Sequence, residues 1–288
     1  MRLELGTVQF GMDYGVNNRS GIVEPEDVKY ILDFAKQHDI LNLDTATAYG
    51  RSETVLGEIG VNDWKIITKI GELNAMDALN EIELQVAQSL QRLNVNSLYG
   101  LLLHRPLELK KPYGDILYEG LLSLKKRGLI EKIGVSVYET SELVELYKKF
   151  AFDIVQLPFN VLDNRFLVSG VLDKLKDKGV EIHARSVFMQ GLLLMDDEQR
   201  PAKFDQWTAI WQQWSEWLNK EKLSKVQGCL AYIKQFSQID YVVVGVDSYQ
   251  QIFQIVTDFE CDYQNVNFDN LPKVQDPMLL NPSNWSSL

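Results

Sequence analysis

The run Leu98-Tyr99-Gly100-Leu101-Leu102-Leu103-His104 decides the fold class, because it is apolar at consecutive positions and ends in a polar residue. A strand with one solvated face would alternate apolar and polar residues, whereas this run is typical of a strand that is buried on both faces. Tyr241-Val242-Val243-Val244-Gly245 has the same character. Strands of this kind belong to parallel sheets that are covered by helices, so the sequence predicts an α/β protein.

Comparable runs recur along the chain and alternate with amphipathic stretches. The predicted strands are Leu3–Phe10, Leu41–Asp44, Lys65–Lys69, Leu98–His104, Lys132–Val137, Ile154–Gln156, Glu181–Arg185 and Tyr241–Gly245. Pro25 is typical of a first helical turn, and Gly128 and Gly179 each follow a basic last turn. Eight strands with helices between most of them predict a closed (β/α)8 TIM barrel. An open doubly wound sheet is the alternative, which the absence of G-x-G-x-x-G after the first strand disfavours.

The bulk composition is that of a globular protein. The chain has 288 residues, of which 45% are hydrophobic and 24% charged, with a formal net charge of −11. That charge disfavours binding to nucleic acid or to anionic membranes. We find no apolar run of the roughly 20 residues that a membrane span needs, and no signal peptide. We therefore expect one barrel domain over residues 1–288 in a cytoplasmic protein; the oligomeric state stays open.

Metal and disulfide chemistry are also disfavoured. The two cysteines, Cys229 and Cys261, are too few for a disulfide framework, and the apolar neighbours of Cys229 predict a buried thiol. Three histidines without an H-x-H pair make a metal-dependent barrel hydrolase or lyase a weak alternative. We expect no metal site.

Several predicted strands have polar or small residues at or next to their ends, and in a barrel these ends converge on the active site. The strand-end residues are Asp44, Lys69, His104, Ser136, Gln156, Arg185 and Gly245, with Tyr49 shortly after Asp44. Alone, Asp44 is explained as a helix N-cap, Lys69 as a solvated strand end and His104 as a core histidine. Together they predict a ligand site.

Several motifs at these strand ends are similar to those of one family. They are Leu43-Asp44-Thr45-Ala46-Thr47-Ala48-Tyr49-Gly50 with Ser52-Glu53, Leu102-Leu103-His104-Arg105-Pro106, Ile133-Gly134-Val135-Ser136, Val155-Gln156-Leu157-Pro158-Phe159-Asn160 and the opening Leu5-Gly6-Thr7-Val8-Gln9-Phe10-Gly11. In this order they resemble the aldo-keto reductases over nearly the whole chain. The resemblance implies an NAD(P)-dependent oxidoreductase that interconverts a carbonyl and an alcohol, with Asp44, Tyr49, Lys69 and His104 as catalytic residues.

The chemistry accounts for these residue types. Reduction of a carbonyl needs a hydride at carbon and a proton at oxygen, and tyrosine is a weak acid whose pKa a nearby cation lowers. We expect Lys69 to supply the cation, Asp44 to hold it, and His104 to orient the carbonyl oxygen. Tyr49 would then be the general acid in reduction and the general base in oxidation.

The resemblance also implies a cofactor site. Ser136 and Gln156 would hold the nicotinamide carboxamide, and the backbone from Gly245 to Ser248 would bind phosphate at a helix start. The full expected set is Gly6, Thr7, Ser136, Gln156, Arg185, Ser186, Gly191, Gly245, Val246, Ser248 and Gln251. Three positions depart from the family pattern. Ile255 lies about where the family often has an asparagine on the last cofactor-binding helix. Val137 replaces an asparagine, and Arg185 replaces an aromatic residue that stacks on the nicotinamide. Arg185 would therefore stack there itself, bind an anionic group of the substrate, or form a salt bridge away from the site.

The choice of cofactor and substrate is less determined. Residues 240–260 contain no Lys or Arg, and a ribose 2′-phosphate needs cations, so we expect weak discrimination or a preference for NAD over NADP. The segment from Arg185 to Gly191 resembles bacterial reductases of sugar and polysaccharide metabolism, which favours a sugar substrate over a small aldehyde or ketone. A cofactor-binding regulatory or non-catalytic barrel subunit is the alternative function.

One segment interrupts the alternation. Met195–Gln206 is polar and contains Pro201, which is typical of a loop at the barrel mouth. Trp207, Trp211 and Trp214 follow at helical spacing. They predict a helix docked by its aromatic side chains, and the alternative is that one of them forms a wall of the substrate pocket.

Overall fold

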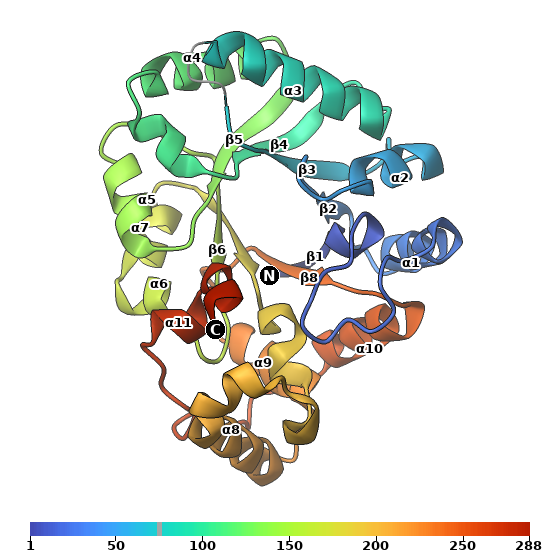
Figure 1. The fold of residues 1–288 in the computed structure, drawn as a ribbon, viewed down its shortest axis with the longest axis vertical. Helices are drawn as coiled ribbons and strands as arrows, with labels where there is room; N and C mark the ends of the chain where they lie inside the picture. Colours follow the sequence, from blue (N-terminus) through green and yellow to red (C-terminus); the bar gives the residue numbers. More distant parts are fainter. Residues whose placement is uncertain (74–76) are drawn as a thin grey trace.

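A computed structural model describes residues 1–73 and 77–288, and in these residues eight parallel strands close into a barrel in sequence order (Figure 1). The strands are β1 Arg2–Gly6, β2 Asn42–Asp44, β3 Lys65–Ile70, β4 Leu98–Leu103, β5 Ile130–Ser136, β6 Ile154–Pro158, β7 Glu181–Arg185 and β8 Tyr241–Gly245. β1 pairs with both β2 and β8, which closes the barrel. The predicted (β/α)8 barrel is confirmed, and the open doubly wound alternative is wrong.

Helices surround the barrel and connect its strands (Figure 1). They are α1 Pro25–Gln37, α2 Ser52–Ile59, α3 Ala78–Leu93, α4 Gly114–Lys126, α5 Thr140–Leu146, α6 Arg165–Val168, α7 Val171–Asp177, α8 Thr208–Glu221, α9 Lys225–Ile233, α10 Tyr249–Glu260 and α11 Pro277–Leu280. Pro25 begins α1 as expected, and Gly128 and Gly179 have φ of +75° and +72° just past the ends of α4 and α7. These positive angles explain why both stops are glycine. No helix among the described residues has the length and apolarity needed to cross a lipid bilayer.

The first predicted strand, Leu3–Phe10, is too long. β1 ends at Gly6, and Val8–Phe10 forms a short 3-10 turn in which the Phe10 N–H donates to the Thr7 carbonyl at 3.0 Å. Val8 and Phe10 are buried and are as apolar as the strand residues before them. Hydrophobicity alone therefore does not distinguish the turn from the strand. The turn places Gln9 at the carboxyl end of the barrel instead of along its wall.

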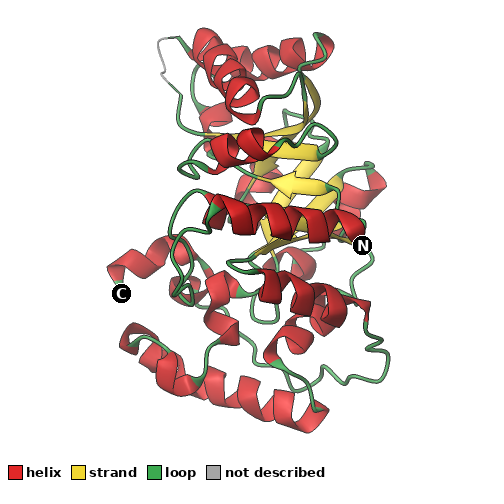
Figure 2. Cartoon of the chain, turned by 90° about the vertical axis from the view of Figure 1, so that its right-hand side faces the viewer, coloured by secondary structure: helices red, strands yellow, loops and turns green. Residues whose placement is uncertain are grey.

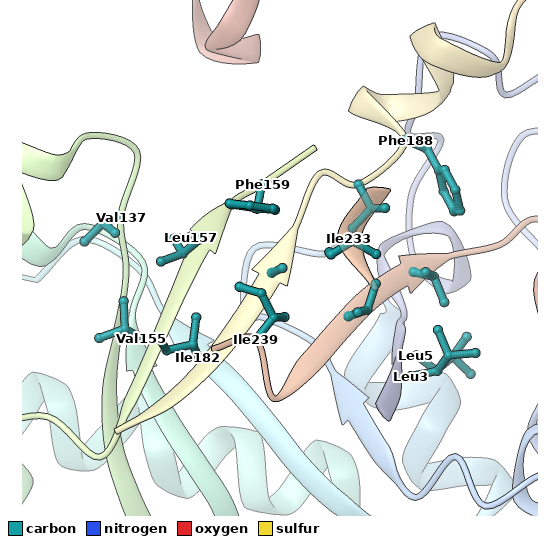
Figure 3. Close-up of a cluster of buried hydrophobic side chains, with 14 of the residues drawn as sticks. Leu3, Leu5, Val137, Val155, Leu157, Phe159, Ile182, Phe188, Ile233 and Ile239 are labelled. Carbon is teal, nitrogen blue, oxygen red and sulfur yellow. The ribbon is translucent and has the colours of Figure 1, made fainter. Parts of the chain in front are cut away.

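The core has two layers, which follow from the alternation of side chains along each strand. The larger layer lies between the strands and the helices, and Figure 3 shows Leu5, Val155 and Ile182 projecting into it from β1, β6 and β7. A smaller separate cluster consists of Ile67, Leu102 and Ile154, with Tyr99 packed against it. Its members have the opposite parity along their strands, so they fill the inside of the barrel.

The C-terminal part packs beside the strand ends. Trp207 ends a 3-10 turn, Ala202–Trp207, and its indole N–H donates to Asp276 at 3.0 Å. Trp211 and Trp214 are buried on α8, and the Trp214 N–H donates to the Leu193 carbonyl at 3.1 Å. The docked tryptophan helix is therefore confirmed, with its start at Thr208. Figure 2 shows the two termini on opposite sides of the molecule.

A charged pair lies inside the barrel. Glu4 on β1 and His183 on β7 are both fully buried, with His183 Nδ1 at 2.6 Å from Glu4 Oε2 and His183 Nε2 at 3.5 Å from Glu181 Oε2. Burial opposes a charge on His183, but the two carboxylates raise its pKa to about 9. The imidazole is therefore a cation in the folded protein near neutral pH, and Glu4 balances its charge.

This pair gives the stability of the barrel a pH dependence. Because the folded pKa of His183 exceeds its unfolded value, the pair contributes fully below about pH 6.5, and its contribution is lost as the pH rises through about 9. We expect His183→Leu, which strands a buried carboxylate, to lower the free energy of unfolding at pH 6 by about 3–5 kcal/mol.

Urea denaturation of the wild type and of H183L at pH 6 and pH 9 measures this effect. The loss caused by the substitution is expected to be smaller at pH 9, and Glu4→Leu combined with His183→Leu is expected to recover stability. His38→Leu, at a partly exposed histidine on the surface, serves as the control. An equal loss at both pH values would contradict the charged pair.

Candidate active site

A cavity of about 410 Å³ opens at the carboxyl ends of the strands. It brings together most of the residues expected from the sequence: Gly6, Thr7, Asp44, Tyr49, His104, Ser136, Gln156, Arg185, Ser186, Gly191, Gly245 and Gln251. Three expected residues lie outside its wall. Lys69 is buried beneath the wall, Val246 is fully buried in the core, and Ser248 caps α10 through a bond from the Gln251 N–H at 3.3 Å.

The strand register explains this convergence. Lys69, His104 and Gln156 each lie two residues beyond a member of the inner cluster, namely Ile67, Leu102 and Ile154. Because strand side chains alternate with a period of two, they too point inward, one layer nearer the barrel mouth. The candidate site is thus a polar layer at the mouth of the barrel interior, one layer above Ile67, Leu102 and Ile154.

A buried ion pair lies at the base of the cavity. Lys69 Nζ is 2.6 Å from Asp44 Oδ2, donates to the Thr45 carbonyl at 2.9 Å, and lies 3.4 Å from the Tyr49 hydroxyl. Lys69 is only 1% exposed, so each of its three N–H donors needs a partner, and these three oxygens supply them. Asp44 accepts a second bond from Gln156 Nε2 at 2.6 Å. Asp44 therefore holds Lys69 and caps no helix.

Close backbone packing fixes the position of Tyr49. A side chain at Gly11 would lie 2.0 Å from the Tyr49 carbonyl oxygen, and one at Gly50 would lie 2.2 Å from the Gly11 carbonyl oxygen. Gly50 also has a φ of +55°. Only glycine at both positions lets the loop after β1 pack on the turn that carries Tyr49.

The pKa of Tyr49 differs from the sequence-based expectation. Burial raises the pKa of Tyr49 above its ordinary value, and Lys69 opposes this shift without overcoming it. Burial also disfavours the charge of Lys69, but Asp44 and Tyr49 raise the pKa of Lys69 overall. Tyr49 is thus a neutral phenol beside a firmly charged ammonium, and the expectation of a lowered tyrosine pKa is wrong for the protein alone.

His104 faces Tyr49 across the cavity, with the ring centroids 6.1 Å apart and the rings nearly perpendicular. Burial, reinforced by Lys69 and Arg185, lowers the pKa of His104 to about 4. The imidazole is therefore neutral at physiological pH. It is a cavity-lining group and not the core histidine that was the alternative.

Arg185 lies in the cavity wall. Its Nη2 donates to the Val137 carbonyl at 3.0 Å, its Nη1 donates to Ser186 Oγ at 3.2 Å, and its guanidinium stacks on the Tyr138 ring at 4.1 Å. Within residues 1–73 and 77–288 no carboxylate lies within 4.0 Å of it, so the expected alternative of a salt bridge elsewhere is wrong. Val137 is fully buried, and its side chain makes no contact with the cavity.

The residues expected to hold a nicotinamide form a polar patch. Ser136 Oγ lies 3.2 Å from Gln156 Oε1, and both side chains are buried at the ends of β5 and β6. Each retains hydrogen-bonding capacity beyond this contact. Gln9 Oε1 is buried without a partner, and its amide lies where a side chain at Gly245 would clash. A buried Gln9 oxygen without a partner, next to the backbone of Gly245, indicates a polar ligand here. The Thr7 hydroxyl is instead engaged by the Asp44 carbonyl and Ser52.

Sequence reasoning missed several wall residues. Gln9, Tyr14 and Tyr138 line the cavity, and all three lie beyond the strand ends. Asp247 also lines it, within the stretch from Gly245 to Ser248 that the sequence predicted. Tyr138 follows the inward-facing Ser136 by two positions, so its parity was a usable signal. Tyr14 comes from the loop before α1, and no pattern in the sequence places that loop. Among the described residues none of Trp207, Trp211 or Trp214 lines the cavity, so the alternative of a tryptophan wall is wrong.

Comparison with known proteins agrees with this architecture. A family model described as the aldo/keto reductase family matches residues 2–275. The holo form of the aldo-keto reductase AKR11C1 from Bacillus halodurans has a TM-score of 0.73 at 19% identity, over 91% of this chain and 87% of that one. PA4992 from Pseudomonas aeruginosa, assigned as an aldo-keto reductase, has a TM-score of 0.66 at 22% identity, over 89% and 88%.

No curated protein sequence matches the chain. The solved structures, at identities below 25%, support the fold, and the family match over nearly the whole chain supports more than that. The chain belongs to the aldo/keto reductase family and is an oxidoreductase of the NAD(P)-dependent, carbonyl-reducing kind.

Proposed function

We propose that this enzyme reduces the carbonyl of a small polar substrate, with Tyr49 delivering the proton to the carbonyl oxygen. The observation that carries the proposal is the continuous chain from Asp44 through Lys69 to the Tyr49 hydroxyl, which ends at the cavity. The cavity walls also carry amide and phenol groups, such as Asn17, Gln190 and Tyr138, which suit an oxygen-rich substrate such as a sugar.

The charge arrangement supports an acid role for Tyr49. The phenol is neutral because burial raises its pKa, so it has a proton to give. As that proton moves to the substrate oxygen, the phenolate that forms is stabilised by Lys69 at 3.4 Å. Asp44 keeps Lys69 in place and charged. The same groups in reverse take a proton from an alcohol.

His104 orients the substrate in this proposal. A neutral imidazole has one N–H to donate, and its ring lies across the cavity from Tyr49. A carbonyl oxygen between the two rings would accept from both. A reduced nicotinamide supplies the hydride when bound, and Ser136 and Gln156 are the residues that fit its carboxamide.

We expect Tyr49→Phe to lower kcat for aldehyde reduction by about 100-fold or more, because the proton donor is lost while the ring stays. Initial rates of NADH and NADPH oxidation with a panel of aldehydes and sugars measure this. The control is Tyr30→Phe, which removes a hydroxyl from an exposed tyrosine on α1. Full turnover by Y49F would contradict the assignment of Tyr49 as the proton donor.

The pH profile is a second test. Reduction needs Tyr49 protonated and His104 neutral, and the pKa of His104 is about 4 while that of Tyr49 is raised. We therefore expect kcat/KM for reduction to be flat from about pH 5 to pH 9 and to fall only at alkaline pH. A fall in kcat/KM near pH 6.5 would show that a histidine with an ordinary pKa titrates in the mechanism, which would contradict the lowered pKa of His104.

The loop after β8 favours NAD. Asp247 contributes to the cavity wall, and its backbone N–H donates to Gln251 Oε1 at 3.1 Å, so a carboxylate and an amide occupy the start of α10. A carboxylate accepts bonds from ribose hydroxyls but repels a 2′-phosphate. Together with the absence of Lys and Arg from residues 240–260, this supports a preference for NAD over NADP.

We expect the wild type to bind NAD about tenfold or more tightly than NADP. Asp247→Asn combined with Gln251→Arg is expected to shift the ratio of the two affinities toward NADP by about 10- to 100-fold, since it removes a repulsion and adds a charge-assisted bond. Quenching of tryptophan fluorescence measures both affinities. A wild type that binds NADP more tightly would refute the preference.

A further inference from the structure

We propose that Arg185 binds a carboxylate on the substrate, with Tyr138 and Tyr14 beside it, so that the natural substrate is an oxo acid such as a sugar acid. This inference rests on the proposed function, because it names the substrate class of the same cavity. It assigns to Arg185 a specificity-determining role toward the substrate in place of stacking on the nicotinamide.

The first observation is that the charge of Arg185 is unbalanced. The cavity wall contains two acidic side chains, Asp44 and Asp247. Asp44 is paired with Lys69, and in the described part of the chain neither carboxylate lies within 4.0 Å of the guanidinium. The partners of Arg185, a carbonyl and a hydroxyl, use two of its five N–H donors. A half-buried cation with spare donors is a site for an anion.

The second observation is that the guanidinium is held in place before any ligand binds. The Val137 carbonyl fixes one nitrogen, and the Tyr138 ring, 4.1 Å from the guanidinium carbon, fixes its plane. A guanidinium that is already ordered loses less entropy when it binds a ligand. Because Tyr138 covers part of the guanidinium, the free N–H edge is the part best placed to take a ligand.

The third observation places this cation beside the reacting groups. Arg185 lines the same cavity as Tyr49 and His104. In keeping with this position, its charge contributes to lowering the pKa of His104 and opposes the rise in the pKa of Tyr49. Tyr14, from the loop before α1, also lines this cavity. Burial raises the pKa of Tyr14, and the charge of Arg185 opposes that rise. An anion bound here belongs to the molecule whose carbonyl lies between Tyr49 and His104.

A carboxylate fits this position better than a phosphate. The two parallel N–H bonds of a guanidinium match the two oxygens of a carboxylate, and one positive charge balances one negative charge. A phosphate monoester carries about −1.5 to −2 charges, and Arg185 is the one cation that reaches the wall among the described residues. With a net charge of −11, the protein offers no general attraction to compensate.

Carbonyl compounds matched in chain length test the proposal. The four-carbon pair is succinic semialdehyde and butanal, and the six-carbon set is glucuronate, glucose and glucose 6-phosphate. We expect the wild type to prefer each carboxylate over its neutral partner by about 10- to 100-fold in kcat/KM. In Arg185→Gln the ratio of acid to neutral substrate is expected to fall to about one, and in Arg185→Lys to an intermediate value. Arg127→Gln, which neutralises an exposed arginine at the C-terminal end of α4, is the control.

A binding measurement gives a readout without turnover. Tyr49→Phe protein loaded with NADH is titrated with glucuronate by calorimetry, and adding Arg185→Gln is expected to weaken binding by about tenfold or more. NADH affinity of the same variants is measured separately. If Arg185→Gln weakens NADH binding as much as glucuronate binding, the side chain serves the cofactor and the proposal is overturned.

The outcomes separate the two levels of inference. Equal turnover of acids and neutral compounds would overturn the carboxylate site and leave the proposed function intact. A preference for glucose 6-phosphate over glucuronate would have the same consequence. If no compound is turned over with either cofactor, the proposed function fails, and the calorimetric titration still decides whether Arg185 binds a carboxylate.

Discussion

The contact between Lys69 and Asp44, 2.6 Å long and almost completely buried, is the interaction on which the site depends. A buried ammonium is costly unless it is paired and all its N–H groups are bonded. Asp44, the Thr45 carbonyl and the Tyr49 hydroxyl meet this requirement together. The phenol is therefore part of the solvation of the lysine, which is why its hydroxyl is held at the base of the cavity.

Barrel closure is what brings the second partner of Asp44, Gln156, to this pair. Asp44 ends β2, Lys69 lies near the end of β3, and Gln156, which bonds to Asp44, comes from β6 across the barrel. The link between β2 and β6 requires that the sheet curve until distant strands face one another. In an open sheet Gln156 would lie several strands away, and one oxygen of Asp44 would lose its partner.

The sequence predicted the parts of this arrangement that follow from periodicity. Apolar runs that alternate with amphipathic stretches predicted the barrel, and the motifs around Asp44 and His104 predicted residues that the structure brings to one cavity. The loops were beyond prediction. The Val8–Phe10 turn is as apolar as a strand, and the turn that carries Tyr49 is positioned by a backbone contact that glycines at 11 and 50 allow. The balance between burial and charge at Tyr49 also needed coordinates, since it depends on depth in the protein.

The loop after β7 shows how the barrel is adapted to carry Arg185. Ser186, Met189 and Gln190 have φ of +59°, +52° and +54°, although none of them is glycine. Such residues cost about 1–3 kcal/mol each and persist only where surrounding contacts hold them. Asn160 Nδ2 donates to the Ser186 carbonyl at 3.0 Å, and the Val16 N–H donates to the Gln190 carbonyl at 2.9 Å.

The first bond comes from the loop after β6 and the second from the loop before α1, which lines the cavity, so contacts with neighbouring loops maintain the strain. A relaxed loop would free Ser186, whose hydroxyl accepts from Arg185, and would release one of the two bonds that aim the guanidinium. The fold thus stores strain where a charged side chain has to be presented without a carboxylate partner. That is the behaviour expected of a wall organised for a ligand, since packing alone would favour a relaxed backbone there.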